Sequence, residues 1–197
     1  MCGRYYIQTE DMHRILSEMI DALNRRETAR GSVFSVKTGE IYPGDRAPVV
    51  ANNRRMTPTP FLMEWGFSME KNKKLINARS ETIHEKSMFR PLLSSRRLLV
   101  PASGYFEWEK GGEKTKYRLS ADDGLIYMSG LYRPSADGGD MEFVILTRSA
   151  APDIEFIHTR MPVILDERRA REWLDLNNDP MRIIHDAYTN VKYAKAN

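Results

Sequence analysis

The chain has 197 residues, of which 41% are hydrophobic and 29% are charged, with a formal net charge of +3. This composition is typical of one water-soluble globular domain over residues 1–197, and the small positive charge permits nucleic-acid binding without implying it. No apolar run approaches the ~20 residues of a membrane span. The first residues lack the pattern of a secretory signal, so we expect a cytoplasmic protein with no membrane partner.

Cysteine and histidine usage argues against a metal site. Cys2 is the only cysteine, which excludes an internal disulfide and a cysteine-rich zinc site and fits a reducing compartment. Histidines are scattered without the spacing of metal ligands, at His13, His84, His158 and His185. We therefore expect no metal ion and no cofactor.

Short β-branched and aromatic segments predict that most elements are strands. The expected strands are residues 2–8, 47–51, 61–67, 97–100, 105–109, 116–120, 125–132, 142–147 and 161–165. The expected helices are residues 10–26, a short helix ending at 88, 89–95 and 166–176, with a turn or helix at 152–157. Many short strands and few helices indicate an α+β fold. We expect a β-rich single domain with a mixed or antiparallel sheet or barrel and peripheral helices.

Turn and cap signals divide these elements. Residues 42–45 form a turn signal at the end of an irregular stretch, and residues 110–113 predict a hairpin turn. Gly66 interrupts a strand and allows close approach of another backbone segment. Asp166 is expected to cap the helix that follows it. The segment from 177 onward has little pattern.

The position of Cys2 gives it distinctive chemistry if Met1 is removed. The α-amine and thiol then lie on adjacent carbons, and such a 1,2-aminothiol condenses with an aldehyde to an imine and closes a thiazolidine ring. An α-amine titrates near ~8 and a lysine near ~10.4, so far more of the α-amine is nucleophilic at neutral pH. Arg4 shares a face with Cys2 in an extended chain, and we expect this cation to raise the thiolate fraction. The alternative is a small buried hydrophobe at a frayed end.

Two further residues are candidates for proton transfer. Glu107 lies between Phe106 and Trp108 in a strand, and alternation places it on the opposite face. Burial there would raise the pKa of its carboxyl and suit an acid–base role, although a solvent-facing glutamate fits equally well. His158 lies in a polar loop before an apolar strand, and histidine transfers protons readily near neutral pH. A lone histidine is nevertheless more often structural.

Other residues are candidates for contacts with nucleic acid. If residues 76–82 are extended, Asn77 and Arg79 point to one side, and an arginine pairs well with phosphate; a buried amide beside a surface ion pair is the alternative. Trp65, Phe67, Met88 and Phe89 are able to stack on or wedge between bases. Aromatic residues in strands are mostly core residues, and we favour a core role for Phe67 and Phe89. Basic residues also concentrate in one part of the chain: Arg54, Arg55, Lys71, Lys73, Lys74, Arg79, Arg90, Arg96 and Arg97.

Together these motifs resemble the SOS-response-associated peptidase (SRAP) family, whose members shield abasic sites in DNA. The motifs occur in the family's order along residues 1–165. They are Met1-Cys2-Gly3-Arg4, Trp65-Gly66, Ile76-Asn77-Ala78-Arg79-Ser80-Glu81-Thr82, Phe89-Arg90-Pro91, Pro101-Ala102-Ser103-Gly104-Tyr105-Phe106-Glu107-Trp108, Ser129-Gly130-Leu131-Tyr132, Ile145-Leu146-Thr147 and His158-Thr159-Arg160-Met161-Pro162-Val163-Ile164-Leu165.

The resemblance implies a catalytic quartet. Cys2, after removal of Met1, would link covalently to the abasic sugar. Asn77 would hold the N-terminal residue and the linked sugar. Glu107 would shuttle protons during ring opening and imine formation, and His158 would assist proton transfer at the sugar hydroxyl.

The resemblance also implies contacts with DNA and an activity. Arg4 and Arg79 would bind phosphates. Pro43 and Trp65 would stack near the lesion. Met88 and Arg90 would make weaker contacts with the DNA. The implied protein is a monomer that binds single-stranded DNA and captures abasic sites as a thiazolidine, with possible AP-lyase and autocatalytic N-terminal peptidase activities. The alternatives are a cysteine peptidase using Cys2 and a non-covalent single-stranded-DNA-binding module.

Two segments depart from the family pattern. Residues 39–42, Gly-Glu-Ile-Tyr, replace the family's usual Tyr-Asn-x-Ala before Pro43, so the segment expected to position Pro43 differs from that of the family. Residues 187–191 only faintly echo the family's last segment.

Overall fold

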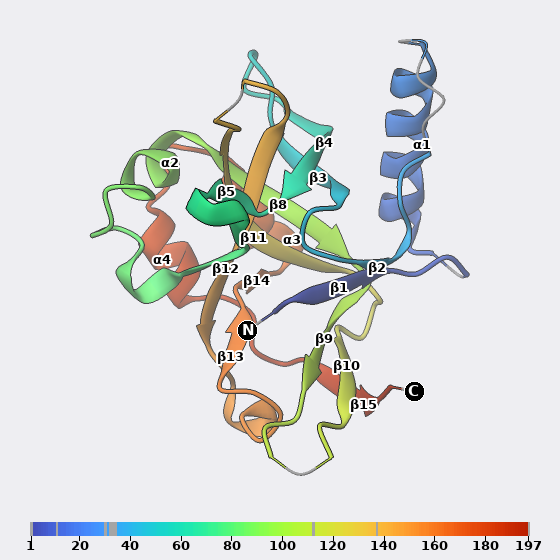
Figure 1. The fold of residues 1–197 in the computed structure, drawn as a ribbon, viewed down its shortest axis with the longest axis vertical. Helices are drawn as coiled ribbons and strands as arrows, with labels where there is room; N and C mark the ends of the chain where they lie inside the picture. The colour runs from blue at the N-terminus through green and yellow to red at the C-terminus, as the bar shows by residue number, and fades with distance from the viewer. Residues whose placement is uncertain are drawn as a thin grey trace.

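Two β-sheets and a small hairpin make up most of the fold, and helices lie around them (Figure 1). The computed structural model describes residues 2–10, 12–29, 31, 35–111, 113–136 and 138–196. Met1 lies outside the described residues, as do parts of the irregular stretch before the turn at 42–45 and of the hairpin turn at 110–113.

The first sheet contains five antiparallel strands in the order β15-β10-β9-β1-β2. Tyr5, Ile7 and Tyr105 point to the core, and the alternate residues Arg4 and Tyr6 point outward. The strands are β1 (Arg4–Ile7), β2 (Gly39–Ile41), β9 (Gly104–Trp108), β10 (Lys116–Ser120) and β15 (Lys192–Lys195).

The second sheet closes into a barrel. β11 (Ile126–Pro134) pairs with both β8 (Arg97–Ala102) and β12 (Met141–Ser149), and β12 pairs in parallel with β4 (Pro58–Trp65). β3 (Arg46–Asn52) joins β4 to β8. These five strands therefore form a ring, which protects their edges. Shorter strands are β7 (Asn77–Arg79), β13 (Arg160–Pro162) and β14 (Ile164–Leu165) on this sheet, and β5 (Phe67–Met69) and β6 (Lys73–Leu75) in a separate hairpin.

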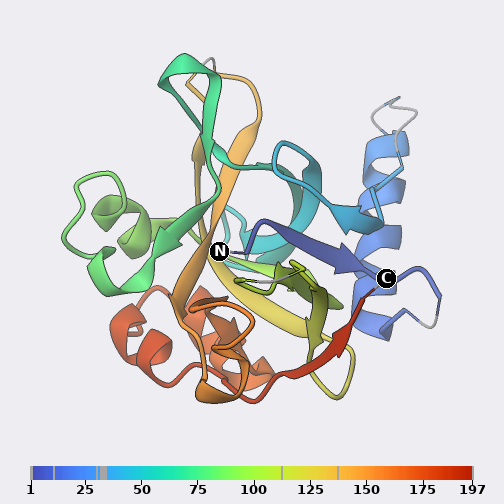
Figure 2. The same ribbon diagram turned by 60° about the horizontal axis from the view of Figure 1, so that its bottom comes forward.

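Helices cover opposite sides of the molecule, with α1 on one side and α2 and α4 on the other (Figures 1 and 2). α1 (Arg14–Ala29) buries Leu16, Met19, Ile20 and Leu23 and packs against β3 and β4. The other helices are α2 (Arg90–Ser95), α3 (Glu167–Leu174) and α4 (Pro180–His185), with single 3-10 turns at η1 (Glu70–Asn72), η2 (Ser80–Thr82) and η3 (Pro152–Ile154). No helix among the described residues is long and apolar enough to cross a membrane.

The structure confirms the β-rich α+β class with a mixed sheet closed as a barrel. The interruption at Gly66 is also confirmed: its φ is +114°, and an added Cβ would lie 3.1 Å from the Cβ of Lys74. Asp166 caps α3, because its carboxylate accepts from the backbone N–H of Arg169 at 2.7 Å.

Several element boundaries differ from the prediction. α1 begins at Arg14, so His13 precedes the helix, and most of residues 80–88 form turns after η2. The strand expected at 161–165 is divided at Val163, whose N–H donates to Leu146. β15 was not predicted, nor were the bounds of α4. The β15 side chains are exposed, so the strand is held by backbone pairing with β10 and carries no apolar pattern.

Arg97 does not belong to a basic surface, because its side chain is buried. Its Nε donates to the carbonyl oxygen of Leu93 at 2.7 Å, and its Nη1 donates to Trp173 and Asn178 at 3.3 and 3.2 Å. The carbonyls at the end of α3 lack intrahelical partners, and the guanidinium satisfies them. This arginine therefore joins α3 to the barrel.

Candidate active site

Asn77 holds the main chain of Cys2. The Nδ2 of Asn77 donates to the carbonyl oxygen of Cys2 at 2.8 Å, and both residues are buried. β7 places Asn77 by pairing with β12, where Ile145 lies opposite it. This hydrogen bond connects Cys2, two residues before β1, to the wall of the barrel.

Glu107 lies on the strand next to the one that begins after Cys2. Arg4 lies opposite Phe106 in the antiparallel β1–β9 pair, and this register places Glu107 beside Gly3. Its side chain is only 4% exposed. Burial raises the pKa of the Glu107 carboxyl to about 7, although the positive charge of Lys110 acts in the opposite direction. Glu107 therefore gains and loses a proton near neutral pH.

The Cys2 thiol is fully buried and stays protonated. Burial raises its pKa well above the usual thiol value, and the negative charge of Glu107 raises it further. We expected Arg4 to favour the thiolate, but the Arg4 guanidinium pairs with Glu40 at 3.1 Å. The Cys2 Sγ instead donates to the carbonyl oxygen of Arg4 at 4.0 Å. The expectation of a thiolate stabilised by Arg4 is therefore wrong for this conformation.

His158 lies in the loop before β13. Its Nδ1 accepts from the backbone N–H of Arg160 at 3.0 Å. Burial lowers the pKa of the imidazole to about 4, and the charge of Lys110 contributes in the same direction. His158 is therefore neutral at pH 7 and carries its proton on Nε2. The Nζ of Lys110 donates to the Oγ1 of Thr159 at 3.0 Å, so a contact joins the turn after Glu107 to the His158 loop.

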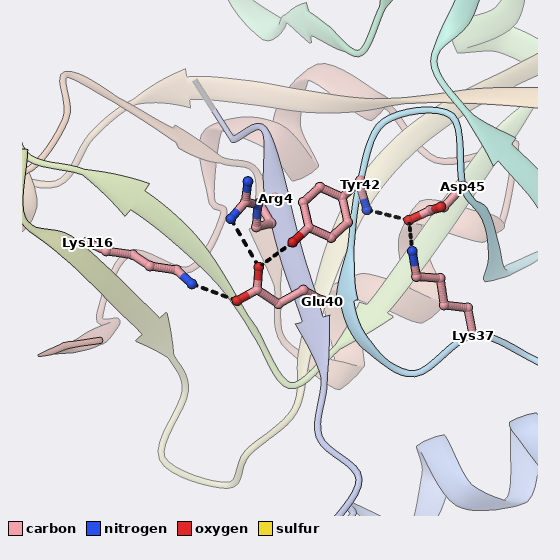
Figure 3. A network of polar contacts seen from close by, with 6 residues as sticks. All are labelled: Arg4, Lys37, Glu40, Tyr42, Asp45 and Lys116. Carbon is pink, nitrogen blue, oxygen red and sulfur yellow. Dashed lines mark hydrogen bonds and ion pairs between the residues drawn. The ribbon is translucent and has the colours of Figure 1, made fainter. Parts of the chain in front are cut away.

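Arg4 belongs to a polar network beside this site, shown in Figure 3. The Glu40 carboxylate contacts Arg4 Nη1 at 3.1 Å, Lys116 Nζ at 2.6 Å and the Tyr42 hydroxyl at 3.0 Å. Hydrogen bonding to Lys116 is the main cause of the lowered pKa of Glu40. Asp45 accepts from the backbone N–H of Tyr42 at 2.7 Å and from Lys37 at 2.6 Å. The ion pairs of Glu40 thus attach residues 39–42, the segment that departs from the family pattern, to β1 and β10.

Most of the remaining candidate residues are exposed. Pro43, Arg79, Met88 and Arg90 all have exposed side chains, so each is accessible to a ligand. Trp65 is the exception. Its side chain is fully buried.

The environment of Trp65 explains its burial. Its indole Nε1 donates to the carbonyl oxygen of Ile76 at 3.0 Å, and its ring centroid lies 5.1 Å from that of Tyr5 and 6.4 Å from that of Phe143. In this conformation Trp65 has no exposed face on which a base could stack. The prediction of stacking at Trp65 is therefore corrected to a core role.

Three residues near the site were not identified from the sequence. Tyr5 and Tyr105 have fully buried hydroxyls without a hydrogen-bond partner among the described residues, and burial raises the pKa of each. Arg160 pairs with Glu81, its Nη2 lying 2.9 Å from Oε2, and the same nitrogen donates to the Thr147 carbonyl at 2.7 Å. The one sequence feature that points to Arg160 is its position two residues after His158.

The described part of the chain contains no group of three His, Cys, Asp or Glu side chains arranged to hold a metal ion.

Nearly the whole chain matches one family model, described as SOS response associated peptidase (SRAP), over residues 1–195. The chain belongs to the SRAP family. No curated protein matches it. Among the residues of the family's motifs, Asn77 donates to the Cys2 carbonyl and Glu107 lies on the strand beside Gly3.

Solved structures show the same fold. A protein of Bacteroides thetaiotaomicron superposes with a TM-score of 0.77 and 21% identity, covering 100% of this chain and 92% of that chain. A phage-related protein of Bordetella bronchiseptica superposes with a TM-score of 0.75 and 21% identity, covering 99% of this chain and 94% of that chain. At this identity the likeness concerns the fold.

Proposed function

We propose that this SRAP protein captures abasic sites in single-stranded DNA through Cys2 after removal of Met1, and that it acts as a cytoplasmic monomer in the DNA damage response. The observation that carries the proposal is the hydrogen bond from Asn77 to the Cys2 carbonyl, beside a buried Glu107 whose pKa is about 7. An abasic sugar in its open form is an aldehyde, which is the reaction partner of a 1,2-aminothiol.

The linkage forms in two bond-making steps. The Cys2 α-amine adds to C1′ of the open sugar, and the carbinolamine loses its hydroxyl as water to give an imine. The Cys2 sulfur then adds to the imine carbon, and the thiol proton passes to nitrogen. Amine, thiol and aldehyde thus give one thiazolidine and one water. The protonated state of the buried thiol suits this order, because the amine reacts first.

The neighbouring side chains supply positioning and proton transfer. Asn77 holds the Cys2 carbonyl, so the amine meets the aldehyde in a fixed geometry. Glu107, with a pKa of about 7, accepts a proton from the attacking amine and returns it to the departing hydroxyl. Neutral His158 donates its Nε2–H to a sugar oxygen. The imine stage also permits slow strand cleavage by β-elimination, so the proposal includes a weak AP-lyase activity.

Residues around the site hold the DNA strand. Half-buried Arg4 and exposed Arg79 contact phosphates beside the lesion, and Pro43, Met88 and Arg90 contribute exposed surface next to it. Removal of Met1 is the step for which the family is named a peptidase, and self-processing or a methionine aminopeptidase would each provide it, since Cys2 is small.

A general cysteine peptidase is the second candidate enzyme. Such an enzyme needs a thiolate beside a base. Burial instead raises the pKa of the Cys2 thiol, and the lowered pKa of His158 makes it a weak base at neutral pH. The structure therefore gives this alternative less support than aldehyde capture.

The test is a denaturing gel of protein incubated with single-stranded DNA that carries one abasic site, after mass spectrometry confirms the loss of Met1. We expect a shifted band that survives heat and detergent. Cys2→Ala and protein that retains Met1 should give no such band. Cys2→Ser keeps the amine, so it should give a band only after borohydride reduction of the imine. Absence of a shifted band from the processed wild-type protein would overturn the proposal.

A further inference from the structure

The outer face of the five-stranded sheet combines aromatic and basic side chains. The register places Arg4 opposite Phe106 and Phe106 opposite Arg118, so these residues share one face. We call this surface the outer sheet face; it comprises Arg4, Tyr6, Phe106, Trp108, Lys116 and Arg118, with Glu40 at its edge. It begins at the site that holds Cys2 and continues along β1, β9 and β10.

Cations on this face lie directly over aromatic rings. Lys116 Nζ is 4.1 Å from the ring centroid of Phe106, and Arg4 Cζ is 4.9 Å from that of Trp108. Glu40 bridges the two cations (Figure 3). Arg118 is exposed and has no ion-pair partner among the described residues. The charges of Arg4, Lys116 and Arg118 therefore exceed that of Glu40.

A groove with a volume of about 480 Å³ lies on this face, and its lining includes Tyr6, Phe106, Lys116 and Arg118. Gly104 is packed closely on two sides. A Cβ there would clash with the carbonyl oxygen of Leu119 and would lie 2.8 Å from Cε1 of Tyr6, so glycine allows both β10 and the Tyr6 ring to approach β9. The rings of Tyr6 and Phe106 are 5.1 Å apart. The half-buried Tyr6 thus presents a supported aromatic surface beside Arg118.

We propose that the outer sheet face binds the part of the DNA strand that leaves the lesion site, with Arg118 and Lys116 contacting phosphates and Tyr6 stacking on a base. This inference rests on the proposed function, because it takes single-stranded DNA as the ligand. A groove that combines cations with aromatic rings suits a flexible polyanion whose bases stack without regard to sequence. Tyr6 is four residues from Cys2, about 13 Å along an extended strand, so the contact lies a few nucleotides from the lesion.

Binding of oligodeoxythymidines with a single tetrahydrofuran residue tests this surface. Tetrahydrofuran has no aldehyde, so the measurement does not require capture. One series is extended stepwise on the 5′ side of the tetrahydrofuran and another on the 3′ side, and fluorescence anisotropy gives Kd at several salt concentrations. We expect one of the two series to gain affinity on extension.

Variants of the outer sheet face should reduce this gain. Arg118→Gln should make the slope of log K against log salt shallower by about 0.7, as expected for one phosphate contact with single-stranded DNA. Tyr6→Leu should weaken binding of the long oligonucleotide about tenfold, and Tyr6→Phe should preserve it because the ring remains. Arg54→Gln, on the β3–β4 turn, is the matched control and should leave the gain unchanged. Thermal unfolding of each variant monitors folding.

The outcomes separate this surface from the proposed function. A gain that is reduced in Arg118→Gln and Tyr6→Leu but unchanged in Tyr6→Phe and Arg54→Gln supports the proposal. No gain in either series overturns it, as does a gain that is undiminished in Arg118→Gln and Tyr6→Leu or is lost in Arg54→Gln. Covalent capture of a short oligonucleotide with a natural abasic site is measured separately. Loss of that reaction in the wild type would contradict the proposed function while leaving the binding result intact.

Discussion

Glu107 should determine how the rate of capture depends on pH. Its buried carboxyl has a pKa of about 7, whereas the pKa of His158 is about 4. The rate of crosslinking to an abasic oligonucleotide should therefore change near pH 7 because of a carboxyl group, while His158 stays neutral throughout. Single-turnover rates between pH 5 and 9 provide the measurement.

Substitution distinguishes the two residues. Glu107→Gln should slow crosslinking by about 10²–10⁴-fold, the usual contribution of a general acid–base group, and should remove the inflection near pH 7. His158→Gln should lower the rate but keep the inflection. An inflection that persists in Glu107→Gln and is lost in His158→Gln would reverse the assignment.

Glu40 belongs to residues 39–42, the segment that departs from the family pattern, and its negative charge lies beside two cations. Its carboxylate occupies Arg4 and Lys116, the cations proposed to meet phosphate. Glu40→Gln should strengthen binding of single-stranded DNA a few-fold at low salt, because pairs of this partly exposed kind contribute about 0.2–1 kcal/mol. Anisotropy titrations provide the measurement. Glu167→Gln removes an ion-paired carboxylate on α3 and should have no effect. Weaker binding by Glu40→Gln would instead mean that Glu40 positions Arg4.

At the scale of elements, α3 offers a direct test of a local sequence signal. The Asp166 carboxylate accepts from the backbone N–H of Arg169 and also pairs with its guanidinium. Asp166→Ala should lower the free energy of unfolding by about 1 kcal/mol through loss of the cap. Asp166→Asn retains a capping oxygen and should lose less. Urea unfolding at pH 7 compares the two, and equal losses would assign the effect to the ion pair.

The same scale shows what the sequence could predict. Elements with a strong local pattern were found: α1 by its apolar spacing, the cap at Asp166 and the break at Gly66. Elements held by distant partners were missed, because β15 depends on hydrogen bonds to β10 and its exposed side chains show no apolar alternation. Sequence patterns also could not show that five strands close into a ring, since the closing contact is the pairing of β12 with β4 and β11.

For the candidate site, the sequence suggested which residues to consider but not which of them are buried. Its candidate residues were chosen from ordered motifs, and the structure places Asn77 on the Cys2 carbonyl. The sequence did not show which of the candidate side chains are buried. Trp65 and Arg97 belong to types often found at nucleic-acid surfaces, yet one donates to a core carbonyl and the other to the end of α3. Their roles depend on acceptors that lie far away in the sequence or in another element.

At the scale of the whole molecule, the barrel and the five-stranded sheet both contribute residues to the candidate site. β7 of the barrel provides Asn77, β9 of the sheet provides Glu107, and the loop before β13 provides His158. Cys2, the residue proposed to react, precedes β1 and accepts a hydrogen bond from Asn77. A carboxyl group enclosed in this way couples the stability of the entire fold to pH.

Glu107 should therefore make the protein less stable as pH rises. Its pKa is about 7 when folded and has a reference value of 4.5, so between these values the native state keeps a proton that the unfolded chain releases. The free energy of unfolding then falls as pH increases through this window, by up to about 3 kcal/mol for this group. Below pH 4.5 both states are protonated and the contribution of this group to the slope vanishes.

Urea unfolding at pH 5, 6, 7 and 8 measures this slope. Glu107→Gln cannot ionise, so its stability should change less with pH, and the difference between variant and wild type should grow in the variant's favour toward pH 8. Glu109→Gln, two residues along and half-buried, is the matched control and should follow the wild-type curve. Parallel curves for Glu107→Gln and wild type would show that the carboxyl titrates alike in both states, and the same result would remove the physical basis for its acid–base role near neutral pH.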